Sequence, residues 1–274
     1  MWRKFFNIFF LAAFSLMLLS GCAGKKDPST EATAPTPVEK LYRQAAVLME
    51  SGKYQESARL FDEVERQYPY SQWATRAQLM AAYAHYRNLR YDEAVLALDR
   101  FIQLHPSDNN IAYAHYLRAL CYYEQISDVR RDQQMTVLAL ENLRNVVQRF
   151  PDSPYARDAR LKMDLTLDHL AGKEMEIGRF YLSTNHYHAA AQRFQRVVDD
   201  YQTTTHVPEA LHRLVETYLA IGIHPEAQKA AAVLGHNYPD SVWYRDSYRL
   251  MKGEIPGEKK DSPTFYDRTL GRIF

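Results

Sequence analysis

Few polar side chains in this sequence are spaced as catalytic or metal-binding groups would be. His186 and His188 form an H-x-H pair that could bind a metal ion, but they fall in a turn and the first turn of a helix. Asp199 and Asp200 lie near a predicted helix end, where surface charge is common. Cys121 lies on a predicted interior face, and buried free cysteines are frequent in proteins. The pattern therefore favours structural roles for these groups.

Motifs for nucleotide, phosphate or hydrolytic chemistry are missing from the sequence. It contains no G-x-G-x-x-G, no P-loop, no G-x-S-x-G and no H-E-x-x-H. Its 10 histidines are scattered and define no site. We therefore expect neither an enzyme nor a metal or cofactor site, and we turn to the elements that could form a binding surface.

The N-terminus has the three parts of a secretory signal. Arg3 and Lys4 precede an almost wholly apolar run, Phe5–Leu19. That run is of signal-peptide length, about 7–15 residues, and short of the ~20 that a membrane-spanning helix needs. The run ends in Leu19-Ser20-Gly21-Cys22, which resembles the lipobox of bacterial lipoproteins.

The lipobox resemblance implies a lipid anchor. Residues 1–21 would be removed as a signal peptide, and Cys22 would carry the covalent lipid, several acyl chains of which hold a protein firmly. The alternative is an unmodified cysteine in an ordinary signal sequence. Ala23 stands where an Asp retains enterobacterial lipoproteins in the inner membrane. We therefore expect lipid anchoring at the periplasmic face of the cell outer membrane.

Charge and composition narrow the class further. The chain has 34 Lys+Arg against 33 Asp+Glu, and removal of Arg3 and Lys4 leaves 32 basic residues. This near-neutral balance gives no general attraction to nucleic acid. With Cys22 lipidated, Cys121 is the only other thiol, which excludes an intrachain disulfide. Only 10 glycines and few β-branched runs favour an all-α chain.

Four domain-like segments follow from the composition. Residues 1–21 are the expected signal peptide, and 22–37 are the expected lipidated flexible tether, because 23–37 hold three prolines and no bulky apolar residue. Repeats fill 38–252, and 253–274 contain a linker and a short amphipathic C-terminal segment.

The repeats are marked by turns in which an aromatic residue or His precedes proline: Tyr68-Pro69, His105-Pro106, Phe150-Pro151 and Tyr238-Pro239. Ser71, Ser153 and Ser241 follow three of these turns and are predicted helix N-caps, and Pro154 suits a first helical turn. Inside each repeat a small residue is followed four positions later by a large one, as in Ala94 and Leu98 or Ala190 and Phe194.

These offsets match the second helix of a tetratricopeptide repeat, a helical hairpin of about 34 residues. The first helices have the small residue that this pattern requires at Ala45, Ala82, Ala119 and Gly178, whereas Val215 departs from it. The sequence therefore predicts an α-solenoid of about five tetratricopeptide-like hairpins.

Two irregularities break the repeat. A polar insertion, Glu124–Gln134, separates the helices of repeat three. In repeat four, 3–4 spacing of apolar residues continues from Tyr155 to Thr184 and predicts one long central helix of about 30 residues, against a usual length near 11–12. Such a helix could brace the two halves of the solenoid.

A binding face is predicted where the first helices of stacked repeats line a concave surface. Residues of repeats one to three at this register are Tyr42, Met49, Leu79, Tyr83, Tyr86, Arg87, Tyr113, Tyr116, Leu120 and Tyr123. Tyrosine joins an apolar ring to a polar tip, which suits peptide binding. The alternative is that half of these tyrosines only pack between helices. Asp128, Arg130, Arg131 and Asp132 in the insertion predict a docking loop for a partner.

Taken together, these features resemble the BamD family of outer-membrane β-barrel assembly lipoproteins, from the lipobox to about residue 250. The resemblance rests on Cys22, Gly52-Lys53-Tyr54, Asp99-Arg100-Phe101-Ile102, Tyr116–Leu120, Val129-Arg130-Arg131-Asp132 and the long helix after Pro151. The chain departs from the family pattern at Gln202, where proline is usual, and in the tail beyond Gly253.

The resemblance implies a non-enzymatic scaffold that helps to insert β-barrel proteins into the outer membrane. Its implied partners are the POTRA region of the barrel-forming subunit BamA, accessory Bam lipoproteins and unfolded outer-membrane proteins, with no nucleic acid. The alternative is another periplasmic tetratricopeptide scaffold, such as the Tol–Pal-associated cell-division protein.

The last eleven residues, Thr264 to Phe274, have an apolar helical face formed by Tyr266, Leu270, Ile273 and Phe274. An isolated helix of this length is marginal in water. The leading hypothesis is that it folds on a neighbouring assembly subunit; the alternatives are docking on repeat five and an unstructured end.

Overall fold

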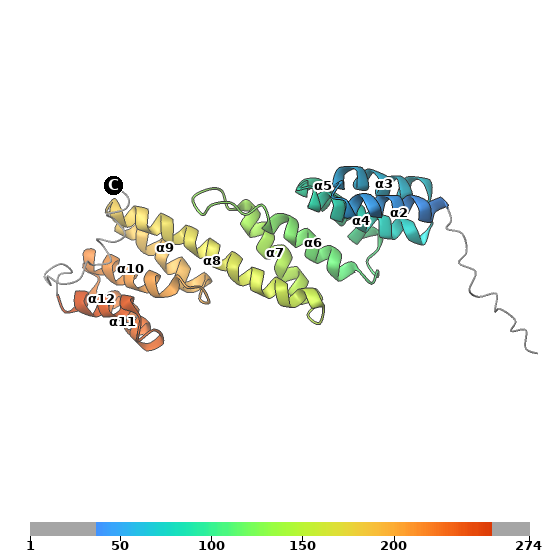
Figure 1. Cartoon of the computed structure of the whole chain (residues 1–274). Coiled ribbons are helices and arrows are strands. Elements are labelled where there is room, and N and C mark those ends of the chain that lie inside the picture. Colours follow the sequence, from blue (N-terminus) through green and yellow to red (C-terminus); the bar gives the residue numbers. More distant parts are fainter. Residues whose placement is uncertain (1–36, 254–274) are drawn as a thin grey trace, which may run out of the picture. The chain divides into compact units, whose positions relative to one another are not determined.

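The computed structural model describes residues 37–253, and within them every regular element is an α-helix (Figure 1). The helices are α2 (Pro37–Glu50), α3 (Tyr54–Gln67), α4 (Gln72–Arg87), α5 (Tyr91–Leu104), α6 (Ile111–Tyr123), α7 (Gln134–Arg149), α8 (Pro154–Ser183), α9 (Tyr187–Asp200), α10 (Val207–Ala220), α11 (His224–Asn237) and α12 (Val242–Met251). The chain divides between Lys40 and Leu41 into two compact units, and the description below concerns the unit that begins at Leu41.

The predicted α-solenoid is confirmed. Helices α4 and α5, α6 and α7, α8 and α9, and α10 and α11 pack as hairpins, and each hairpin packs on the next. In the first repeat the Ser57 hydroxyl of α3 donates to the Ala45 carbonyl oxygen of α2, at 2.8 Å. Helix α12 packs on α10 and α11 and was not part of the predicted five hairpins.

The small-residue positions explain how the hairpins close. Ala94, Ala139 and Ala190 are fully buried, as are the large side chains four residues later in each helix. At Gly178 of α8 the space is tightest, because a Cβ atom there would overlap the Phe194 ring of α9. Glycine therefore lets Phe194 lie directly against the α8 backbone.

The serine caps form at two of the three predicted sites. Ser71 and Ser241 each accept a hydrogen bond from the backbone N–H three residues on, at 3.1 Å. Ser153 holds the N-cap position of α8, but its hydroxyl makes no such bond, and the Ala156 N–H donates to the Ser153 carbonyl oxygen instead. All three predicted N-cap positions are thus confirmed, only the side-chain hydrogen bond is missing at Ser153, and Pro154 occupies the first turn.

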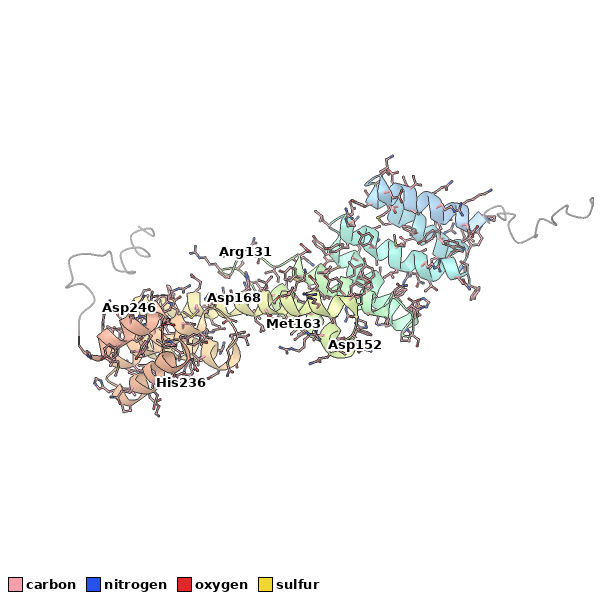
Figure 2. All side chains as sticks on the ribbon, turned by 60° about the horizontal axis from the view of Figure 1, so that its bottom comes forward. Arg131, Asp152, Met163, Asp168, His236 and Asp246 are labelled. Atoms are coloured by element: carbon pink, nitrogen blue, oxygen red, sulfur yellow. The ribbon has the colours of Figure 1, made fainter. Side chains whose placement is uncertain are left out.

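The long central helix is confirmed as α8, of 30 residues. Helix α8 contacts α6 and α7 of repeat three and α9 of repeat four, so a single helix packs in both repeats (Figure 1). Met163 and Asp168 mark its middle in Figure 2. None of the helices between residues 37 and 253 combines the length and apolar character needed to cross a membrane.

Candidate partner-binding surfaces

Tyrosine rings from three successive first helices form one aromatic surface, which we call the tyrosine face. On α4, Tyr83 and Tyr86 stack with ring centroids 6.4 Å apart. On α6, Tyr113 and Tyr116 each lie 5.3 Å from the ring of Tyr155 on α8. The predicted register therefore does bring these α4 and α6 residues onto a common aromatic surface.

The polar tips of the tyrosine face are held by charged side chains. Arg87 donates to the hydroxyl oxygens of Tyr83, at 2.9 Å, and Tyr54, at 2.6 Å, and its guanidinium lies 4.9 Å from the Tyr54 ring centroid. The Tyr86 hydroxyl donates to Glu124, at 3.4 Å, and the Tyr116 hydroxyl donates to Asp158. These contacts fix the rings while leaving them half-buried.

Three tyrosines of this face, Tyr86, Tyr113 and Tyr116, have a raised pKa and stay protonated at ordinary pH. Burial, followed by the charge of Glu124, raises the pKa of Tyr86 to about 12. Burial also raises the pKa of Tyr113 and of Tyr116. Tyr86 and Tyr116 therefore present neutral rings whose hydroxyl protons are held by Glu124 and Asp158.

The other two predicted tyrosines lie in different surroundings. The Tyr123 ring is half-buried, with the Lys162 ammonium 5.4 Å from its centroid. Tyr42 packs between Phe61 and Trp73, at centroid distances of 5.2 and 4.8 Å. For Tyr42, packing between helices therefore describes the contacts better than an open face does.

Three tyrosines of this surface were missed by the helix register. Tyr54 and Tyr91 begin second helices, and Tyr155 follows Pro154 in the first turn of α8. The Tyr91 ring lies 5.9 Å from that of Tyr86. The sequence signal for Tyr54 and Tyr91 was the turn inside each repeat. In that turn a tyrosine is the first residue of the second helix and lies beside the first helix of the same repeat.

The repeat-three insertion lies against the middle of α8. The Lys173 ammonium donates to the carbonyl oxygens of Arg130 and Arg131, at 3.1 and 3.3 Å, and Arg130 Nε lies 3.8 Å from Glu176 Oε2. The side chains of Arg130, Arg131 and Asp132 are exposed, and Arg131 points away from α8 in Figure 2. A fixed backbone thus presents charged side chains to solvent.

Charged side chains also cross between helices in the C-terminal repeats. Arg179 of α8 donates to Glu209 of α10, at 3.1 Å, and Arg213 donates to Glu216, at 2.6 Å. Burial alone would raise the pKa of Glu216, but the hydrogen bonds and charges of His212 and Arg213 outweigh it and lower that pKa. His212 in turn bonds Ser247 of α12, at 2.8 Å. We call these residues the ionic network.

The remaining candidates for chemistry are placed as follows. His186 and His188 are exposed, and among residues 37–253 no cluster of three or more His, Cys, Asp or Glu could hold a metal ion. Asp199 and Asp200 are exposed at the end of α9. Cys121 is fully buried, and burial raises the pKa of its thiol to about 12, which leaves it unreactive. Cys22, with the signal peptide, the tether and residues 254–274, lies outside the described residues.

Comparison with known proteins decides the family. The model of an outer membrane lipoprotein family, YfiO, matches residues 35–234. The outer membrane protein assembly factor BamD of Caulobacter vibrioides is 52% identical over 85% of this chain and 76% of its own length. The chain belongs to the BamD family. BamD of Rickettsia prowazekii is 48% identical over 86% of this chain and 93% of its own, and BamD of Neisseria meningitidis serogroup B is 34% identical over 85% and 92%.

Among solved structures, the chain is similar to a thermophilic TPR protein of Thermus thermophilus, with a TM-score of 0.37 and 17% identity over 78% of this chain and 98% of that one. Membership of the BamD family gives the role: the chain is a non-enzymatic factor in outer membrane protein assembly and a member of the Bam complex. The resemblance found in the sequence is therefore confirmed, and the Tol–Pal alternative is set aside.

Proposed function

We propose that this assembly factor uses two surfaces, one for unfolded outer-membrane proteins and one for the barrel-forming subunit BamA. The observation that supports the first is the tyrosine face, which spans α4, α6 and the start of α8. Half-buried rings with fixed hydroxyl tips suit an extended segment with alternating apolar and polar side chains, as in a β-barrel strand. The Tyr83 hydroxyl accepts from Arg87 and so keeps its own proton to donate to the client.

The client surface includes Tyr83, Tyr86, Arg87, Tyr116 and Tyr123. Arg87 holds the hydroxyls of Tyr54 and Tyr83 and is itself exposed, so it can also meet a carboxylate of the client. Tyr42 contributes by positioning Phe61 and Trp73 behind this surface. The client segment therefore binds across repeats one to three.

The test is photocrosslinking of the purified chain to a C-terminal peptide of an outer-membrane β-barrel protein. Tyr83→Ala with Tyr123→Ala should lower the yield about tenfold, because truncating interface aromatics costs more than about 1 kcal/mol each. Tyr70→Ala is the matched control, since Tyr70 is wholly exposed outside this surface. Unchanged crosslinking, or loss of helical circular dichroism in the double variant, contradicts the proposal.

The second surface is the insertion, with Arg130, Arg131 and Asp132. Its backbone is tied to Lys173, so binding does not have to order a free loop first. We assign it to the POTRA region of BamA, with accessory Bam lipoproteins on neighbouring parts of the solenoid. Arg131→Glu should weaken binding of a purified POTRA fragment. Arg144→Glu is the matched control, because Arg144 is an exposed residue of α7, and it should leave binding unchanged. Equal binding by both variants would reject this assignment.

Attachment to the outer membrane from the periplasmic side is assigned to lipid on Cys22. The Cys22→Ala chain should then leave the membrane fraction after a high-salt wash. If it stays with the outer membrane, something other than the lipid is the anchor.

A further inference from the structure

A small pocket opens midway along α8, between the insertion and the connection from α9 to α10. Its volume is about 240 Å³. Its apolar lining residues are Val129, Leu165 and Gly172, and its polar lining residues are Asp168, His169, Glu176, Arg179 and His206. Asp168 marks this part of α8 in Figure 2.

The polar lining of the pocket has one unused group. Asp168 Oδ1 accepts from the Thr205 N–H, at 3.0 Å, and from the Thr205 hydroxyl, at 2.8 Å. By contrast, His169 Nε2 is buried and has no hydrogen-bond partner among the described residues. A buried polar atom without a partner is costly, so a small rotation of the His169 ring that brings Nε2 to a donor in the pocket would be favourable.

The floor of the pocket depends on glycine. A Cβ atom on Gly172 would lie 3.3 Å from His206 Nε2 and 3.6 Å from Val129 Cγ1. The absence of a side chain at residue 172 therefore keeps the insertion and the α9–α10 connection close to α8 while leaving room beside them.

An apolar stripe leads along α8 into this pocket. Leu165 is 61% exposed and Leu161, one turn earlier, is 60% exposed. Leu161, Leu165 and His169 are each four residues apart. The two exposed leucines and the pocket opening therefore lie on one face of α8, one turn from each other. Exposed leucines in a row on one helix face indicate a surface that another segment covers.

The chain's own C-terminal sequence has the same spacing. Tyr266, Leu270 and Phe274 are each four residues apart, so in a helix they share one face. Laid antiparallel to α8, that face puts Tyr266 at the pocket when Leu270 lies on Leu165 and Phe274 on Leu161. No shift of register is needed along the three turns.

Tyrosine also fits the pocket chemically. Pockets for small-molecule ligands are usually about 300–1,000 Å³, so this one matches a single large side chain better. The Tyr266 ring would contact Val129 and Leu165, and its hydroxyl would donate to His169 Nε2.

The linker is long enough to reach. Ser247 of α12 bonds His212 of α10, and about 9 Å of helix separates His212 from His206 at the pocket. Gly253 is about 9 Å of chain beyond Ser247, and packed helix axes are about 8–10 Å apart. The path runs from Gly253 back along α12, across to α10, along α10 and across to the pocket on α8, which is about 36 Å. The residues from Gly253 to Tyr266 can extend to about 43 Å.

We propose that residues 264–274 of this chain dock in cis on α8, with Tyr266 in the pocket beside His169 and with Leu270 on Leu165. Attachment through a short linker gives a millimolar effective concentration, which helps a helix that is marginal alone. The docked segment lies next to Val129 of the insertion, so it shields the leucine stripe in the free chain.

The test measures how fast a water-soluble maleimide reacts with Leu165→Cys in the full chain carrying Cys22→Ser. Removal of residues 264–274 should speed the reaction at least about fivefold, as expected for a segment held at millimolar effective concentration. Leu96→Cys is the matched control, because Leu96 is 70% exposed on α5, and its rate should not change. Tyr266→Ala should act like the deletion.

Three outcomes would overturn the proposal. Equal rates with and without the segment mean that it does not cover Leu165. Protection that grows with protein concentration assigns the stripe to a second copy of the chain. Protection that appears only after a purified assembly subunit is added assigns the segment to that partner.

Discussion

The first three repeats and the region from α8 to α12 hold their helices together in different ways. In the first, neighbouring repeats meet through half-buried tyrosine rings on α4, α6 and the start of α8. In the second, acid–base pairs cross from helix to helix, and their carboxylates are well covered: Glu174 is 12% and Glu209 15% exposed. The tyrosine hydroxyls are held by exposed or partly exposed side chains such as Arg87 and Glu124, whereas Glu174 and Glu209 are held by ion pairs that are largely covered.

The apolar cores show the same contrast. A single cluster around Phe194 runs from α8 through α9, α10 and α11 and is joined by residues of α12. In the first repeats, the residues around Leu98 and those around Leu143 form separate clusters. We infer that the N-terminal repeats can yield locally, while the C-terminal repeats respond as a block.

The largest effect should come from truncating a core phenylalanine. Phe194→Ala and Phe101→Ala both remove a fully buried ring, and each should cost about 3–5 kcal/mol of unfolding free energy. Hydrogen exchange should then rise throughout α9–α12 in the first variant, but only in α4–α6 in the second. If Phe101→Ala exposes α9–α12 equally, the two regions do not differ in cooperativity.

A smaller effect is expected from removing a charge. Arg213→Ala leaves partly buried Glu216 without its arginine, while Glu209 keeps Arg179, and the loss should cost about 3 kcal/mol in urea unfolding. Arg87→Ala is the matched change in the N-terminal region. Arg87 is exposed, so solvent screens its ring contacts and Arg87→Ala should cost much less than Arg213→Ala. Similar losses in both variants would remove the electrostatic part of the contrast.

The smallest effect concerns pH and His115, which is 3% exposed and stacks on Phe150 at 5.2 Å. Burial, followed by the charges of Arg118 and Arg149, lowers the pKa of His115 to about 4. The unfolded chain therefore binds the proton more readily, and stability present above pH 6.5 is lost as pH falls toward 4. Between pH 6.5 and 5.5 the loss is below about 1.4 kcal/mol.

His115→Phe keeps the ring packing and should flatten this pH dependence. Chemical denaturation at pH 7 and pH 5.5 measures it. An unchanged slope in the variant would mean that another group titrates in this range.

The local sequence pattern was enough to predict the hairpins and α8. The alanines and large residues that define each repeat lie four positions apart, so their common helix face can be read without knowing the fold. The attachment of the insertion could not be predicted in this way, because Lys173 meets the carbonyl oxygens of Arg130 and Arg131 more than forty residues away.

The binding surface was predictable in part for the same reason. Tyr83 and Tyr116 follow the helix period, but their partners Arg87, Tyr54 and Asp158 become apparent only when the hairpins are stacked. Tyr42 shares the period and yet packs between Phe61 and Trp73, since the period alone does not distinguish an open face from an interface.

Helix α8 has a consequence for how the chain unfolds. In an array of separate repeats, a defect can stop at the loop between two units, and melting proceeds in stages. Here the 30 residues of α8 supply one wall to each of two neighbouring cores, so continuous helix joins the core around Leu143 to the core around Phe194. Fraying from either end must therefore break a continuous ladder of backbone hydrogen bonds in mid-helix. Heat or force should therefore release the two cores that share α8 together, whereas the separate core around Leu98 can still open on its own.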